Sequence, residues 1–129
     1  MTDFCCDNTG GRVILTIDGK RMRTRGGITI RPIPFERTVD AHDDGTHYVM
    51  TKARPAEASF TLSYLCTLPI NLSDLMKACR IDVTFDLIDM RKRFLYTQAS
   101  LLGRPEISTE SGEIRGLSVS SSLVKEISY

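Results

Sequence analysis

The clearest structural signal in the chain is the stretch Ile81-Asp82-Val83-Thr84-Phe85-Asp86-Leu87. Its odd-numbered positions are apolar and its even-numbered positions carry Asp, Thr and Asp, which is the period-2 pattern of a strand with one buried face. Apolar and polar residues alternate in several other segments as well. Strands are therefore also expected at residues 12–17, 20–25, 28–33, 47–51, 58–65, 94–101 and 117–127.

One helical signal interrupts the strands. Asn71 can cap a helix over about residues 72–79, with Asp74 in its first turn. One short helix among six to eight strands predicts a mainly β fold, an antiparallel β-sandwich or open barrel with a single flanking helix. Residues 12–129 would form this domain, whereas residues 1–11 are polar, end in a glycine pair and read as an N-terminal arm.

Length and composition exclude several classes of protein. The chain has 129 residues and a mass of 14.4 kDa, which corresponds to one domain. Its 17 basic and 16 acidic residues give a net charge of +1, so a strongly basic nucleic-acid binder is not the default expectation. No run approaches 18 apolar residues, so no membrane insertion is expected. The N-terminus lacks a basic region followed by an apolar stretch, which predicts synthesis in a cytoplasm without a secretory signal.

The segment that follows the predicted hairpin turn Asp18-Gly19 is unusually basic. Three interpretations of this strand are open. A nucleic-acid patch would need interleaved aromatic residues, which the segment lacks. A charged edge strand would prevent unwanted pairing, and a basic surface could meet an acidic neighbour in an oligomer. Its basic residues are Lys20, Arg21, Arg23 and Arg25, joined further along by Arg31 and Arg37.

Residues 35–46 are predicted to form a long polar loop, because no apolar anchor follows Phe35 except Val39. A loop of this length in a compact domain is usually functional or is ordered by a partner. Its charged residues are Glu36, Arg37, Asp40, Asp43 and Asp44. A calcium loop beginning at Asp40 fails because Thr51 occupies the position that needs a bidentate Glu. The spacing of its two histidines is not diagnostic of a transition metal, so no metal site is predicted.

No pattern predicts catalysis. The chain contains no Gly-x-Ser-x-Gly motif, and neither glycine pair opens a helix as a phosphate loop would. The carboxylates of Asp82, Asp86 and Asp89 lie near one strand's polar face. Exposure of this face to water explains them more simply than a role in acid–base catalysis. We therefore expect neither an enzyme nor a cofactor.

The four cysteines are Cys5, Cys6, Cys66 and Cys79, and they contain no Cys-x-x-Cys. One interpretation is four reduced thiols, with Cys66 and Cys79 buried as small apolar residues. The other is disulfide formation between subunits after release into an oxidising medium. A flexible arm carrying Cys5 and Cys6 would reach thiols of a neighbour.

Several short motifs follow one another along the chain in a recognisable order. They are Asp18-Gly19, Gly26-Gly27-Ile28-Thr29-Ile30-Arg31-Pro32, Glu36-Arg37-Thr38-Val39, Asp44-Gly45, Lys52-Ala53-Arg54-Pro55-Ala56-Glu57 and Gly112-Glu113-Ile114. Their order resembles the tail tube protein of contractile-tailed bacteriophages of the Mu-like type, over about residues 11–127. The family often has a Trp near the end of the strand that corresponds to residues 94–99, and this chain has none there. The arm with vicinal cysteines is also not expected of the family.

The resemblance implies a structural protein of the virion tail, made in the host bacterial cytoplasm. Six subunits would form a ring, and rings would stack into a hollow tube inside a contractile sheath, with baseplate and tail-terminator proteins as further partners. DNA would pass through the lumen during ejection without specific binding. Two alternatives are the tube of a type VI secretion-like injection machine and a small β-barrel module that binds nucleic acid.

Two groups of residues receive roles on this reading. The 35–46 segment is expected to be mobile in a free subunit and ordered against the next ring. The even-numbered face of the central strand, with Asp82, Thr84 and Asp86, is a candidate lumen face, because acidic groups would repel the phosphates of passing DNA. The competing interpretation places this face in water on the outside.

Overall fold

The computed structural model describes residues 11–65, 68 and 71–129, and this part of the chain contains eleven strands and one short helix. The elements are β1 (Val13–Ile17), β2 (Lys20–Met22), β3 (Thr24–Arg31), β4 (Phe35–Ala41), β5 (His47–Ala53), β6 (Ala56–Ser63), α1 (Leu72–Lys77), β7 (Ile81–Leu87), β8 (Lys92–Leu102), β9 (Glu106–Ser108), β10 (Glu113–Ser121) and β11 (Leu123–Ser128).

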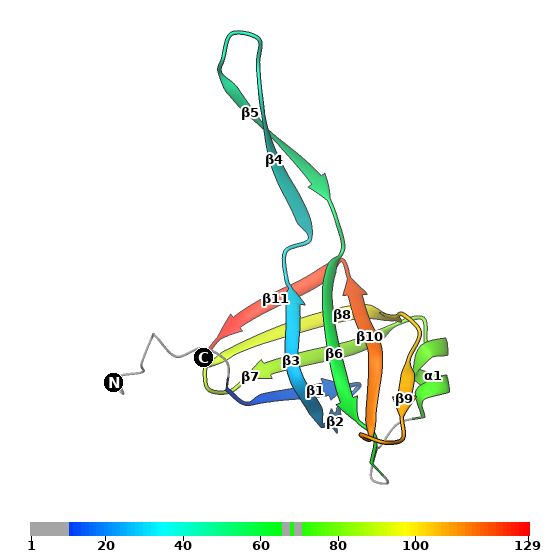
Figure 1. Ribbon diagram of the computed structural model, residues 1–129. Coiled ribbons are helices and arrows are strands. Elements are labelled where there is room, and N and C mark those ends of the chain that lie inside the picture. Colours follow the sequence, from blue (N-terminus) through cyan, green and yellow to red (C-terminus); the bar gives the residue numbers. More distant parts are fainter. Residues whose placement is uncertain (1–10, 66–67, 69–70) are drawn as a thin grey trace.

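The strands form an antiparallel open barrel with a long hairpin projecting from one end (Figure 1). Nine strands belong to one sheet with the order β2-β1-β7-β8-β10-β6-β3, in which β11 also pairs with β8 and β9 with β10. Strand β2 pairs with β1, and β3, which starts two residues after β2 ends, pairs with β6. The segment Lys20–Arg31 therefore joins the two ends of the sheet. The predicted fold class, mainly antiparallel β with one short helix, is confirmed.

The core lies between the sheet's inward faces and is centred on β7. Ile81, Val83 and Phe85 are buried, as their alternation predicts. The Phe85 ring meets Tyr96 on β8 and Phe60 on β6 edge-on, with centroids 5.4 Å and 6.0 Å apart. Tyr96 supplies the large buried aromatic of a strand that lacks Trp.

Two strand predictions need correction. The expected single strand over 117–127 is two strands, β10 and β11, which turn at Ser122. The buried hydroxyl of Ser121 accepts the Leu123 amide at 3.0 Å and donates to the Thr97 carbonyl, which stabilises the turn. The sequence predicts two strands, over 20–25 and 28–33, that are separated by Gly26-Gly27, but this pair lies inside the single strand β3, where the register against β6 shifts between Arg25 and Thr29.

The helix α1 ends at Lys77, two residues earlier than expected. Its cap is confirmed, because the Asn71 side chain accepts the Ser73 amide at 3.0 Å. Leu75 is its buried residue and joins the core. Between β8 and β10 the chain also forms the short strand β9, which pairs antiparallel with the start of β10.

Candidate assembly surfaces

The segment predicted as a loop over 35–46 is instead the first strand and the turn of a β-hairpin. Strand β4 pairs with β5 over seven registered positions, from Phe35 opposite Ala53 to Ala41 opposite His47. The turn between them is closed by the amide of His42, which donates to the Thr46 carbonyl at 2.6 Å. The loop prediction is wrong because Asp44-Gly45 is a turn signal, and the strands on either side of this turn pair Val39 with Val49.

No residue of the hairpin is buried. Phe35, Val39 and Val49 lie on one of its faces, with exposed fractions of 46%, 67% and 44%. An isolated two-stranded hairpin is marginal in water, because it has no second layer against which to bury its apolar side chains. The rest of the described chain therefore does not cover these three apolar side chains.

The five charged residues singled out in this segment all lie on the hairpin. Glu36 and Arg37 lie near its root, and the carboxylates of Asp40, Asp43 and Asp44 lie at its tip. Asp44 accepts hydrogen bonds from the hydroxyl and the amide of Thr46, at 2.6 Å and 3.0 Å, and these bonds hold its pKa below the usual value. The tip is therefore a small acidic surface on a rigid turn.

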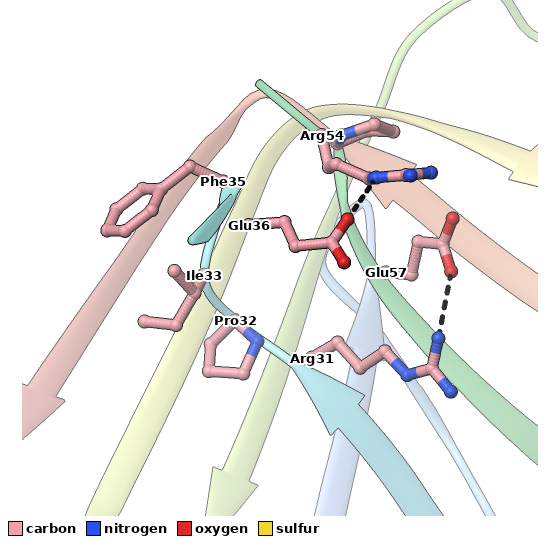
Figure 2. Close-up of a pocket in the computed structure, with 8 residues that line it drawn as sticks. Arg31, Pro32, Ile33, Phe35, Glu36, Arg54 and Glu57 are labelled. Atoms are coloured by element: carbon pink, nitrogen blue, oxygen red, sulfur yellow. Dashed lines mark hydrogen bonds and ion pairs between the residues drawn. The ribbon is translucent and has the colours of Figure 1, made fainter. Parts of the chain in front are cut away.

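An open hollow of about 560 Å³ lies at the hairpin root, where β3 leads into β4 and β5 leads into β6 (Figure 2). Two ion pairs form one side of it. Arg54 Nε lies 2.7 Å from Glu36 Oε2, and Arg31 Nη1 lies 3.9 Å from Glu57 Oε2. Figure 2 shows Ile33 pointing away from these pairs, and its side chain is 54% exposed. The sequence did not predict this hollow, although prolines mark both connections between the barrel and the hairpin. Pro32 and Pro34 lie between β3 and β4, and Pro55 lies between β5 and β6.

The candidate lumen face on β7 contains an ion pair and a hydrogen bond between side chains. Asp82, Thr84 and Asp86 lie on the face of β7 opposite the buried residues, as expected. Asp86 pairs with Arg93 at 3.1 Å and accepts the Tyr129 hydroxyl at 2.6 Å. That hydrogen bond is the main cause of a raised pKa at Tyr129. This face is therefore a mixed, ion-paired surface rather than a free acidic one.

A second outward face, which sequence reasoning did not assemble, is rich in hydroxyl groups. Ser59 on β6 stands opposite Thr29 on β3 and opposite Ser118 on β10. The alternation along 58–65 predicts that Ser59 and Thr61 share one face of their strand, but it does not show which residues lie beside them on neighbouring strands. The hydroxyl face consists of Thr29, Ser59, Thr61, Ser100, Ser118 and Ser120.

The basic segment begins in a short edge strand. Strand β2 pairs only with β1, and Arg21 and Arg23 are exposed. Neither forms an ion pair within the described residues. Arg25, in contrast, donates to Ser63 Oγ at 2.8 Å and to the Ser111 carbonyl.

Cys79 is exposed just after α1, so the interpretation that buries it is wrong. Cys5, Cys6 and Cys66 lie outside the described residues. Within the part of the chain that the structure describes, no three His, Cys, Asp or Glu residues are placed to hold a metal ion. No helix in that part is long enough to cross a membrane.

Comparisons with known proteins agree on one architecture. The family model of the phage tail tube protein matches residues 7–126. No curated protein matches the chain. A chain of the sheath–tube complex of an extracellular contractile injection system, named PVC, has a similar fold, with 11% identity, a TM-score of 0.64 and coverage of 92% of this chain and 89% of that one.

Two further solved structures share the fold. A chain of the PVC sheath/tube terminator has 10% identity and a TM-score of 0.67, covering 96% of this chain and 100% of that chain. Hcp1 from Flavobacterium johnsoniae has 14% identity and a TM-score of 0.59, covering 91% of this chain and 98% of its own. At these identities the likeness concerns the fold.

Proposed function

Because this chain belongs to the phage tail tube protein family, we propose that its subunits form homohexameric rings that stack into a hollow tube. The subunit is a structural protein, and no catalytic step is assigned to it. The observation that supports stacking most directly is the hairpin, which carries exposed Phe35, Val39 and Val49 with no cover from the described residues of its own chain. Seven residues per strand extend it by about 23 Å, enough to contact an adjacent ring.

The tube is proposed to lie inside a contractile sheath of the Mu-like type, in a virion tail that is assembled in the host bacterial cytoplasm. Sheath, baseplate and tail-terminator proteins are its partners in this proposal. Two of the structurally similar chains come from assemblies named as a sheath–tube complex and a sheath/tube terminator, which supports partners of these kinds. DNA would pass through the lumen during ejection without specific binding.

Two faces compete for the channel wall. The face with Asp82, Thr84 and Asp86 was proposed from its acidity, but Arg93 neutralises Asp86 and adds a cation to which phosphates could bind. The hydroxyl face has small uncharged side chains along its middle, and its ion pairs lie toward its two ends, Arg31 with Glu57 at one and Arg25 with Glu113 at the other. Its chemistry fits a surface over which a polyanion slides, so we favour it for the channel.

Cysteine labelling separates the two faces. Thr84→Cys and Ser118→Cys would be made in a background with the four native cysteines replaced by serine. A bulky maleimide reacts poorly with a thiol inside an assembled tube and readily with one outside, whereas both react in dissociated subunits. Protection of Ser118→Cys alone supports the hydroxyl face, and protection of Thr84→Cys alone supports the acidic one.

The self-assembly itself is tested on the purified protein. We expect negative-stain microscopy to show rings or tubes, and sedimentation to show hexamers or larger species. Only monomers at high concentration, with none recruited into tubes by the other tail proteins, would overturn the proposal. A monomer that binds DNA in a salt-sensitive way would instead support the small nucleic-acid-binding barrel.

The second candidate is the tube of a type VI secretion-like machine, which the likeness to Hcp1 favours at the level of fold. The composition of purified particles separates the two functions. Recovery of this chain in DNA-filled virions, detected by mass spectrometry, supports the phage tube. Recovery only in particles without DNA supports the secretion-like tube.

Disulfides between subunits remain a proposal for Cys5, Cys6, Cys66 and Cys79. The exposure of Cys79 supplies one accessible thiol for a neighbour's arm. Non-reducing electrophoresis of alkylated particles is the test. A ladder that collapses on reduction supports the cross-links, and a single monomer band excludes them.

A further inference from the structure

Two surfaces of opposite charge lie at opposite ends of the subunit. Strand β3 runs from the end of β2 to the root of the hairpin, so the β2 edge and the hairpin tip are separated by the length of β3 plus that of the hairpin (Figure 1). The tip surface consists of Asp40, Asp43 and Asp44, and the β2 surface consists of Arg21 and Arg23. Neither surface is apolar or covered by the described chain.

Neither surface has a counter-charge within the described residues. No ion pair involves the three tip carboxylates, whose hydrogen bonds go to local groups such as Thr46 and Tyr48. Arg21 and Arg23 form none either, although the neighbouring Lys20 shares a hollow with Asp18 and Asp74. Arg21 and Arg23 are therefore two exposed cations that have no ion-pair partner within the described residues.

The two surfaces cannot neutralise each other within one subunit. The eight residues of β3 span about 26 Å and the hairpin adds about 23 Å, at roughly 3.3 Å per residue. Salt screens exposed charges beyond about 8–10 Å near physiological ionic strength. A second copy of the chain, placed head to tail, brings the opposite charges into contact.

We propose that the acidic hairpin tip of one subunit docks on the basic β2 edge of a subunit in the next ring. This inference rests on the proposed stacking of rings and names the two surfaces that make the contact. Because the two surfaces differ, the contact is heterologous and leaves a free acidic end and a free basic end, so it repeats without closing. The charges set the direction and register of stacking, and the adjacent apolar face with Val39 and Val49 supplies buried area.

Charge reversal tests the contact. One variant combines Asp40→Lys with Asp43→Lys, and the other combines Arg21→Glu with Arg23→Glu. Each places like charges across the proposed contact, so we expect the fraction of protein that sediments as tubes to fall at least tenfold. A variant with all four substitutions restores opposite charges in reversed order and should assemble again, as should an equimolar mixture of the two reversed variants.

Conservative variants serve as matched controls. Arg21→Lys with Arg23→Lys, and Asp40→Glu with Asp43→Glu, keep every charge and should assemble like the wild type. Circular dichroism melts of dissociated subunits check that the reversed variants are folded. Tube formation by the reversed variants at wild-type levels, or failure of the folded four-substitution variant to assemble, overturns the contact while leaving stacking intact. A wild type that never assembles overturns the proposed stacking and this contact together.

Discussion

The barrel and the hairpin use the same sequence pattern and reach opposite states of burial. In β7 the alternation places Val83 and Phe85 against a second layer, and both are buried. In β4 and β5 it places Val39 opposite Val49, the described residues provide no second layer there, and both side chains are exposed. Alternation therefore specifies which side chains share a face, whereas burial depends on what covers that face. The barrel provides its own cover, whereas the described residues provide none for the hairpin, and the proposed stacking of rings would supply it.

The largest effect is expected where the barrel is best packed. Phe85→Ala removes a fully buried ring that contacts Phe60 and Tyr96, and should lower the free energy of unfolding by about 3–5 kcal/mol. Chemical denaturation of dissociated subunits measures this loss. Phe35→Ala on the hairpin is the matched control and should change it by less than about 0.5 kcal/mol. Equal losses would contradict the division of the molecule into two regions.

A backbone contact at the rim of the barrel should come next. Gly103 has φ +95°, and a Cβ there would collide with the carbonyl oxygen of Gly116. Gly103→Ala should therefore destabilise the subunit by about 2–3 kcal/mol, through strain and the steric clash. Gly45→Ala, at φ +91° but in open space on the hairpin, carries the strain without the clash and should cost less in a thermal melt. The reverse order would contradict the assigned clash.

A smaller effect should arise where the two regions join. The hydroxyl of Tyr96 donates to the Glu57 carbonyl at 2.9 Å and lies 3.3 Å from the Arg31 carbonyl, just below the hairpin root. Tyr96→Phe removes this link and should cost about 1–2 kcal/mol. Urea titrations near pH 7 measure the loss, with Tyr64→Phe on an exposed ring as the control. An unchanged midpoint would contradict a structural role for the hydroxyl.

The same hydroxyl predicts a dependence of stability on pH. Burial, and secondarily Glu57, raises the pKa of Tyr96 to about 12 from an ordinary value of 10.0. A raised pKa in the folded state means that the neutral form is favoured there, so this contribution is complete below pH 10 and is lost as the pH rises toward 12. Stability of the wild type should fall in that window more steeply than that of Tyr96→Phe. Parallel curves would show that Tyr96 does not titrate as described.

Substitutions on the hairpin should have the smallest effect on the stability of an isolated subunit. They therefore test the contrast between the covered barrel and the exposed hairpin. Val39→Ser with Val49→Ser should change the free energy of unfolding by less than about 0.5 kcal/mol, because both side chains are already exposed. The same variant should raise the protein concentration needed for tube formation severalfold. Sedimentation across a concentration series measures this, with Thr38→Ser on the opposite face as the control. Unaltered assembly would show that this face stays exposed in the tube.

Elements with a local signal were predictable from the sequence. The bounds of β7 and the Asn71 cap agree with expectation, because period-2 alternation and capping residues act over a few neighbouring positions. The hairpin was missed because its strands carry charged residues on both faces, although Asp44-Gly45 marks its turn. The hydroxyl face and the hydrogen bond between Tyr129 and Asp86 could not be predicted from the sequence, because they depend on which residues of distant segments lie side by side.

The attachment of the hairpin determines how the subunit resists a pull. Both legs of the hairpin continue into neighbouring strands, the end of β3 and the start of β6, and β6 is held on its other side by β10 over seven registered pairs. A force along the hairpin therefore pulls β6 lengthwise past β10. Hydrogen bonds between antiparallel strands run across the strands, so such a load shears many of them at once rather than opening them one after another. The hairpin is therefore anchored in a geometry that resists shear, as a coupling that transmits tension from one subunit to the next would need to be.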